Sequence, residues 1–296
     1  MGNILTKQFY RQRKDFEDSC AGRDAGLTFP EGVRCSTDIA YADDGIKAHL
    51  LDIYRPEDSQ EKILPVIINV HGGGLIIGNK EFNRYFCALL CKKGFLVYSI
   101  EYRLIPDCLI YDQIADVFMA MDYIKERLAA DGGDSSHVYM AGDSGGACLI
   151  TYANAIQNST NIARAANVTP SGLRINALGL ISGMFYTSRF DKIGLFLPKY
   201  LYGRDYKKTS FAKYVNPENR ELLNSLAPVW LVTSHNDFLR RYTTDFEKAL
   251  TRAEREHELV VFPKNKKLTH AFSVFEPFLP ESSAVIDMMV EYLRKF

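Results

Sequence analysis

The hydrophobic positions of this chain fall into short continuous runs separated by helical stripes. Runs of branched and aromatic residues at 64–70, 95–102 and 137–142 are typical of strands that are buried on both faces. Between the last two runs, residues 112–130 place apolar side chains every three or four positions, as on one face of a helix. Strands that alternate with helices predict a mostly parallel central sheet with helices on both faces.

The alternation continues to the end of the chain and is preceded by a hairpin. Further strands are expected at 175–182, 228–234 and 258–263, and further helices at 81–93, 146–157, 239–256 and 283–295. Before the first buried strand, two shorter strands flank the turn Asp43-Asp44-Gly45, which indicates a hairpin. Residues 1–30 are polar with isolated aromatics, and we expect one or two helices there.

One segment interrupts the alternation. Between about 183 and 225, the expected strand–helix step is replaced by a longer stretch that is rich in Phe and Tyr. A long insertion in a compact domain is typical of a lid or binding element, although a helical pair packed on the surface would have the same composition. We expect an N-terminal cap segment at 1–30 and a main domain at 31–296 that carries the cap insertion.

Composition excludes several classes of protein. The 36 basic and 36 acidic residues give zero net charge, and no cluster of cations indicates a nucleic-acid partner. We expect a cytoplasmic protein without stable membrane insertion, because no apolar run is long enough to cross a bilayer and the N-terminus lacks a signal-peptide core. Cys87 and Cys91 lie one helical turn apart, but no second ligand pair supports a metal site, so the six cysteines are expected to be free thiols.

A candidate catalytic serine lies in the stretch VYMAGDSGGAC, residues 138–148. Residues 142–146 fit G-x-S-x-G, the nucleophile elbow of α/β-hydrolases, and they also match the pentapeptide around the nucleophile of trypsin-like proteases. Those proteases are all-β and order their triad His, Asp, Ser, whereas Ser144 lies mid-chain between an expected strand and a helix that begins near Ala147. This strand–turn–helix context favours the hydrolase elbow.

A second glycine-rich motif follows the first buried strand. His71-Gly72-Gly73-Gly74 stands at the carboxyl end of that strand, where open α/β sheets place their ligands. Consecutive glycines let backbone N–H groups approach a substrate closely. We expect the N–H groups of Gly72, Gly73 and Gly145 to form an oxyanion hole, with His71 and Gly74 beside it.

Together these motifs resemble the hormone-sensitive-lipase-like branch of the α/β-hydrolases, which includes microbial acetyl and short-chain carboxylesterases. The resemblance runs from about Leu50 to the C-terminus, and its most specific pieces are HGGG (71–74), EYRLIPD (101–107), the 142–146 elbow, LVTSHNDFLR (231–240) and LTHAF (268–272). Two positions depart from the branch. Leu75 stands where an aromatic residue is common, which bears on the acyl pocket, and Gly145 stands where alanine is usual, which loosens the elbow.

The triad is expected in the chain order Ser, acid, His. His270 follows the last expected strand, in the loop where the resemblance implies the catalytic base, whereas His235 would precede any acid from its own loop. Asp237 follows the strand at 228–234 and is the candidate acid, although an Asp in front of a helix is also an ordinary N-cap. Asp143, next to the nucleophile, is expected to point away from it and to act as support.

The sequence therefore predicts an α/β-hydrolase that acts as a serine carboxylesterase on short-chain or small aromatic esters, without cofactor or metal. Ser144 would be the nucleophile, His270 the base and Asp237 the acid that orients it. An amidase or arylformamidase on the same scaffold would carry similar motifs. A non-catalytic ligand-binding module is a third reading, although receptors of this fold have lost the histidine that is present here. A homodimer is left open, because members of this branch often dimerise.

Overall fold

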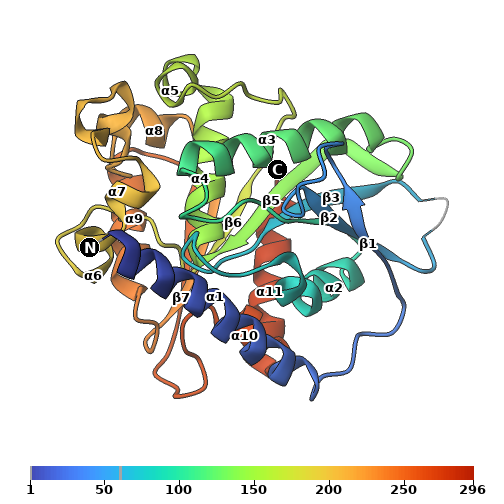
Figure 1. The fold of residues 1–296 in the computed structure, drawn as a ribbon. Coiled ribbons are helices and arrows are strands. Elements are labelled where there is room, and N and C mark those ends of the chain that lie inside the picture. The colour runs from blue at the N-terminus through green and yellow to red at the C-terminus, as the bar shows by residue number, and fades with distance from the viewer. Residues whose placement is uncertain (1, 60–61) are drawn as a thin grey trace.

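The computed structural model describes residues 2–59 and 62–296, with side chains from residue 4 onward. In this part of the chain, one eight-stranded sheet has the order β1-β2-β4-β3-β5-β6-β7-β8 (Figure 1). The strands are β1 (Val33–Ala40), β2 (Leu50–Pro56), β3 (Leu64–Val70), β4 (Leu96–Ile100), β5 (Gly133–Asp143), β6 (Leu178–Ile181), β7 (Val229–Ser234) and β8 (His257–Phe262). β2 pairs antiparallel with β1 and β4, and the other neighbours pair parallel, so the predicted hairpin and mostly parallel sheet are confirmed.

Helices cover both faces of this sheet. They are α1 (Gly2–Asp24), α2 (Arg84–Lys92), α3 (Ile110–Arg127), α4 (Ser144–Asn158), α5 (Thr160–Ala166), α6 (Lys192–Phe196), α7 (Pro198–Leu201), α8 (Arg220–Asn224), α9 (Arg240–Arg252), α10 (Phe272–Phe275) and α11 (Pro280–Leu293), with 3-10 turns η1 (Lys80–Asn83), η2 (Tyr206–Lys208) and η3 (Ser210–Tyr214). None of the described helices combines the length and the apolarity that crossing a membrane requires.

The central strand β3 explains why helices are needed on both faces. Val66, Ile68 and Val70 pack in one apolar cluster with side chains of α3 and α4, whereas Ile67 packs in a second cluster with side chains of α2 and α11. Figure 1 shows these two pairs of helices on opposite sides of the sheet. All four side chains are fully buried, so the strand forms a stable layer only between two layers of helices.

The cysteines contribute to this packing. Cys87 and Cys91 are both buried in α2, as two core residues on one helix face. All six cysteines lie in the described part of the chain and all six are free thiols, as the sequence predicted.

The N-terminal helix and the segment between β6 and β7 meet on one side of the molecule. α6, α7, η2, η3 and α8 all lie in that segment, and α1 runs across the front of the view near them (Figure 1). Phe9 of α1 contacts Tyr200 of α7, with ring centroids 5.2 Å apart, and Phe16 contacts Phe82 at 4.8 Å. Two segments that are far apart in the sequence therefore share one surface.

Candidate active site

Ser144 stands in the tight turn between β5 and α4. Its φ of +50° lies in the left-handed region, which residues with side chains rarely adopt. The turn needs glycine on both sides, because a Cβ at Gly146 would lie 2.1 Å from the carbonyl oxygen of Val70, and one at Gly142 would lie 2.9 Å from the carbonyl carbon of Gly146. The buried strand and helix on either side hold the strained residue in place.

Three side chains from separate loops meet at this turn. The Nε2 atom of His270 lies 2.9 Å from Oγ of Ser144, and its Nδ1 atom lies 2.7 Å from Oδ1 of Asp237. Asp237 follows β7 and His270 follows β8, so all three come from the carboxyl edge of the sheet. Because an ionised carboxylate only accepts hydrogen bonds, Nδ1 carries the proton and Nε2 is left to accept the serine hydroxyl.

Asp237 is buried and held by several donors. Its Oδ1 also accepts the N–H of Leu239 at 2.8 Å, just before α9, and its Oδ2 accepts the hydroxyl of Thr233 at 2.8 Å. Burial alone would raise its pKa, but the hydrogen bond and charge of His270 outweigh this effect, so the pKa of Asp237 lies below its ordinary value. The carboxylate is thus ionised at neutral pH, and it both orients the imidazole and supports the start of the helix.

His235, the other histidine considered as a base, lies away from the contacts between Ser144, His270 and Asp237. His235 is exposed, and its Nδ1 atom pairs with Nη1 of Arg240 at 2.8 Å. Among the described hydrogen bonds, the imidazole that contacts Oγ of Ser144 is that of His270.

The backbone donors near Ser144 differ in part from the expected set. The N–H of Gly72 donates to Oδ1 of Asp143 at 3.0 Å, so it is already paired and is not available to an oxyanion. The N–H groups of Gly73, Gly74 and Gly145 have no hydrogen-bond partner among the described residues. A Cβ at Gly145 would lie 2.9 Å from the nitrogen of Gly74. The loop that contains Gly72, Gly73 and Gly74, called the glycine loop below, is therefore in contact with the start of α4. Unpaired N–H groups lie on both sides of this contact.

Asp143 precedes the nucleophile, but its carboxylate is turned to the glycine loop. Besides the N–H of Gly72, its Oδ1 accepts Nδ2 of Asn83 at 2.9 Å. Burial raises the pKa of this carboxyl above its ordinary value, although the Asn83 hydrogen bond opposes the shift. These contacts fasten the loop to the elbow, and the sequence offered no reason to single out Asn83.

His71 helps to hold the glycine loop in place. Its ring stacks on Tyr102, with centroids 4.4 Å apart. Its Nε2 atom lies 2.8 Å from Oε1 of Glu101, and its Nδ1 atom lies 2.9 Å from the carbonyl oxygen of Gly72. Burial lowers the pKa of His71, but the charge and hydrogen bond of Glu101 raise it overall above its ordinary value. Both ring nitrogens are occupied, so this histidine acts as a structural anchor.

Leu75 lies outside the cavity, although it was expected to shape an acyl pocket. Its side chain is fully buried in the core and its φ is +68°. The carbonyl oxygen of Leu75 accepts the N–H of Ile105 and the Nε2 of Gln113, both at 3.0 Å. This residue therefore fixes the path of the glycine loop, and it does not line the cavity at the serine.

A cavity of about 430 Å³ opens on Ser144, His270 and the glycine loop. This volume is typical of sites for small molecules. Apart from these groups its walls are mainly apolar, and its largest side chains are Phe16, Phe82, Met184, Leu197, Phe238 and Phe275. Since Phe16 belongs to α1 and Leu197 follows α6, the N-terminal helix and the insertion both form part of its wall.

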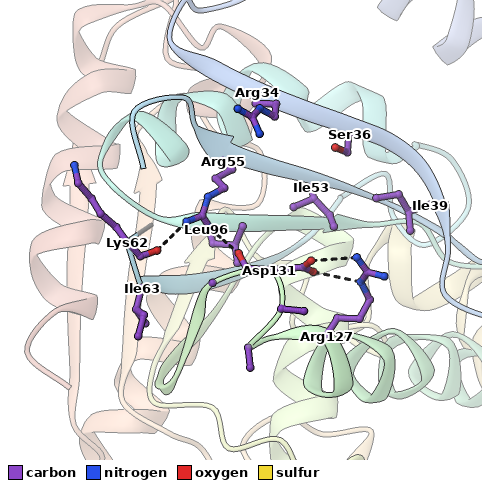
Figure 2. Close-up of a pocket in the computed structure, with 13 residues that line it drawn as sticks. Arg34, Ser36, Ile39, Ile53, Arg55, Lys62, Ile63, Leu96, Arg127 and Asp131 are labelled. Carbon is purple, nitrogen blue, oxygen red and sulfur yellow. Dashed lines mark hydrogen bonds and ion pairs between the residues drawn. The ribbon is translucent and has the colours of Figure 1, made fainter. Parts of the chain in front are cut away.

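A larger cavity, of about 640 Å³, lies at the opposite edge of the sheet (Figure 2). Its lining includes three arginines, and two of them, Arg55 and Arg127, are held by partners. Arg55 donates to the carbonyl oxygens of Ser59, Lys62 and Asp131, and Arg127 pairs with the carboxylate of Asp131 at 3.1 Å. Its described lining contains no histidine. These arginines tie loops together, and the candidate chemistry lies at the smaller cavity.

The family of this chain follows from comparison with known proteins. Residues 67–273 match the family profile described as alpha/beta hydrolase fold, which covers more than half of the chain. The chain therefore belongs to the α/β-hydrolase fold family, and within it to the hormone-sensitive-lipase-like branch.

Similar solved structures have the same fold. Esterase B from Lactobacillus rhamnosis superposes with a TM-score of 0.92 over 99% of this chain and 95% of that chain, at 22% identity. The structure titled bacterial heroin esterase superposes with a TM-score of 0.71 over 98% of this chain and 92% of that chain, at 21% identity. At this identity, the likeness establishes the fold alone.

Curated relatives match over part of their length. Isoprenylcysteine alpha-carbonyl methylesterase ICME of Arabidopsis thaliana is 28% identical over 155 residues, which cover 52% of this chain and 35% of that protein. Esterase LipQ of Mycobacterium tuberculosis is 33% identical over 120 residues, which cover 40% of this chain and 28% of that protein. The match thus spans about a third of the length of these relatives.

Proposed function

We propose that this chain is a serine carboxylesterase that hydrolyses small carboxylic esters through an acyl-enzyme. The observation that carries the proposal is the continuous line from Ser144 Oγ through His270 to Asp237, with contacts of 2.9 and 2.7 Å. The esterase names of similar proteins support the same reaction class. A ligand-binding module would not need a base aligned on a strained serine.

In the first half-reaction, Oγ of Ser144 attacks the ester carbonyl carbon while Nε2 of His270 takes the hydroxyl proton. The ionised carboxylate of Asp237 stabilises the imidazolium that results. As the tetrahedral intermediate collapses, the bond from carbon to the alcohol oxygen breaks and His270 gives its proton to the leaving alcohol. Water then repeats the sequence on the acyl-enzyme, releasing the carboxylic acid and the free serine.

The developing oxyanion would be held by the N–H groups of Gly73, Gly74 and Gly145. Gly74 thus replaces Gly72 in the set of donors expected from the sequence. Unpaired donors that are fixed before the reaction stabilise charge without a cost of reorganisation. Loss of one such donor lowers kcat by about 10²- to 10³-fold in enzymes of this type.

Short acyl groups fit this site best. The cavity of about 430 Å³ is closed by Phe16 of α1 and by Ile193 and Leu197 of the insertion, and we assign these two segments as its cap. Apolar walls bind an acyl or small aryl group by removing its surface from water. The proposed substrate class is therefore small esters.

Hydrolysis of p-nitrophenyl butyrate tests the assignment. Ser144→Ala should lose activity by several orders of magnitude, whereas Ser210→Ala, at an exposed serine outside the cavity, should retain it. A fluorophosphonate probe should label the wild type at Ser144, as located by peptide mass. Matched butyrate ester and butyramide substrates separate an esterase from an amidase. Equal turnover by wild type and Ser144→Ala would reject the proposal.

A further inference from the structure

Five large apolar side chains are exposed on the segments that form the wall of the active-site cavity. Their exposed fractions are 92% for Phe190, 75% for Phe238, 74% for Ile4, 57% for Leu195 and 53% for Phe196. We call these five side chains the apolar rim. Single exposed apolar residues are common on proteins, but several on neighbouring segments indicate a binding surface.

Three segments that form the cavity wall each carry part of the apolar rim. Phe238 lines the cavity itself, and its ring centroid lies 4.4 Å from that of His270. The rim residues of α6 and the turn before it flank Ile193, which lines the same cavity. Ile4 belongs to α1, which contributes Phe16 to the wall, and Figure 1 places the start of α1 near α6.

The pattern along α1 separates an inner from an outer side. Phe9 and Phe16 lie inward against the rest of the molecule. Ile4, Lys7 and Lys14 are exposed, and at spacings of three and ten residues they fall on one stripe of the helix, opposite the inner side. The helix is thus packed on one side, and from Ile4 to Lys14 its other side is apolar and cationic, with no Asp or Glu in that range.

Charge on this surface is uneven although the net charge of the chain is zero. Lys7 and Lys14 of α1, Lys192 of α6 and Lys199 of α7 are exposed and make no ion pair with a described residue. Arg11 is also exposed, and its carboxylate partner, Asp15, is 3.8 Å away. The exposed acidic residues of α1, Asp15, Glu17 and Asp18, all come after Lys14, so the excess of cations is confined to the first half of this helix and to α6 and α7.

We propose that this face docks reversibly on an anionic lipid surface, so that esters held in that surface enter the cavity directly. The apolar rim would enter the boundary between headgroups and acyl chains, and the lysines would pair with anionic headgroups. A second copy of the chain is a poorer partner, because a two-fold interface would bring like cations together. The docking stands on its own, whereas its consequence for substrate choice rests on the proposed esterase activity.

Vesicle co-sedimentation of the full chain carrying Ser144→Ala tests docking without hydrolysis. Binding should be strong on mixed phosphatidylcholine–phosphatidylglycerol vesicles, weak on phosphatidylcholine alone, and weaker as salt is raised. Lys7→Ala and Lys14→Ala should each weaken binding about fivefold, and Phe190→Ser with Phe196→Ser should weaken it by more. Ile63→Ser is the matched control, because Ile63 is also 74% exposed but lies directly before β3, at the opposite edge.

In the active chain, the Phe190→Ser/Phe196→Ser variant should retain turnover of a soluble butyrate ester and lose turnover of an ester embedded in phosphatidylglycerol vesicles. Equal binding to the two vesicle types, or an equal loss with Ile63→Ser, would overturn the proposal. So would sedimentation showing a dimer that the rim substitutions dissociate, since the face would then belong to a second copy. The lysine variants remain decisive if the Phe variant does not fold. Failure of the esterase assay alone leaves the vesicle result standing.

Discussion

Gly145 and Leu75 approach each other so closely that position 145 has no room for a side chain. A Cβ at Gly145 would lie 2.8 Å from the backbone nitrogen of Leu75 and 2.9 Å from that of Gly74, distances that real Cβ atoms essentially never show. These two positions are the ones at which the sequence departs from its branch. The contact indicates that the departures belong together, because the missing methyl group lets the glycine loop settle on the start of α4.

Gly145→Ala should therefore harm the enzyme, even though alanine is the usual residue of the branch. The methyl group would push the glycine loop and displace its N–H groups from the oxyanion, so kcat should fall by about 10²-fold, as for loss of one donor. Overpacking should also lower the free energy of unfolding by about 1–3 kcal/mol. Steady-state kinetics and urea unfolding measure both effects.

Gly22→Ala is the control for that substitution. Gly22 lies in α1 with open space at its Cβ position, so alanine there should leave kcat unchanged and stabilise the helix by up to about 1 kcal/mol. An unchanged kcat in Gly145→Ala would show that the loop and elbow can separate without loss of the oxyanion hole.

Arg13 of α1 should influence catalysis, although it does not line the cavity. Its guanidinium donates to the carbonyl oxygen of Ile76 at 2.8 Å and of Ile105 at 2.6 Å, and it pairs with Asp107 at 2.7 Å. It thereby ties α1 to the glycine loop. Arg13→Met should lower kcat by about tenfold or more, because small shifts of positioning groups are costly in rate. Arg13→Lys should restore little, since one ammonium cannot replace the planar fork.

The matched variant for Arg13 is Arg11→Met, on the same helix but with 84% of its side chain exposed. Its turnover of a soluble ester should equal that of the wild type. Comparing kcat with KM separates displacement of the loop from loss of the cavity wall. If Arg13→Met changes KM alone, the arginine shapes the cavity but does not position the loop.

The fold could be predicted largely from the sequence because burial on both faces demands a continuous apolar run. The strand expected at 64–70 is β3 to the residue, and the helix expected at 112–130 is α3 (Ile110–Arg127). α5 and α10 were not expected, since seven and four residues are too few to form a distinct apolar stripe. Their positions depend on tertiary contacts that local sequence does not encode.

The candidate site was predictable where a motif requires one residue type at one place. Ser144, Asp237 and His270 follow strand ends that meet at one edge, and the structure brings them into contact. The pairing of Gly72 was not predictable, because it depends on the orientation of the Asp143 carboxylate. The unusual residues Leu75 and Gly145 could be recognised in the sequence. The contact between them could not, because it joins two separate loops.

Asp237, the proposed acid of the triad, should control both turnover and the pH dependence of stability. Asp237→Asn keeps the shape of the side chain but presents an amide to Nδ1 of His270, so the imidazole takes the wrong tautomer and kcat should fall by about 10⁴-fold. The carboxylate contributes stability because the pKa of Asp237 is lowered below 3.8 by its contact with His270, against the effect of burial. This contribution is present above the carboxyl's ordinary pKa and is lost as the pH falls through the lowered pKa.

Urea unfolding of wild type and Asp237→Asn, compared from neutral pH to about pH 3, measures that contribution. The wild type should be the more stable protein at neutral pH, and the difference should shrink at the acid end. A difference that stays constant over this range would assign the stability of Asp237 to its neutral hydrogen bonds and not to its charge.

The wall formed by α1 should set the length of the acyl chain that the cavity accepts. Phe16 lines the cavity and packs on Phe82, with ring centroids 4.8 Å apart. Phe16→Ala opens this end of the cavity, so the ratio of kcat/KM for hexanoate over butyrate esters should rise by about fourfold for each additional methylene that becomes buried. Phe29→Ala is the control, because Phe29 stacks on Tyr54 at 6.5 Å and does not line the cavity. Its hexanoate-to-butyrate ratio should match the wild type, and an equal rise in both variants would point to general loosening of the fold instead of a wider acyl site.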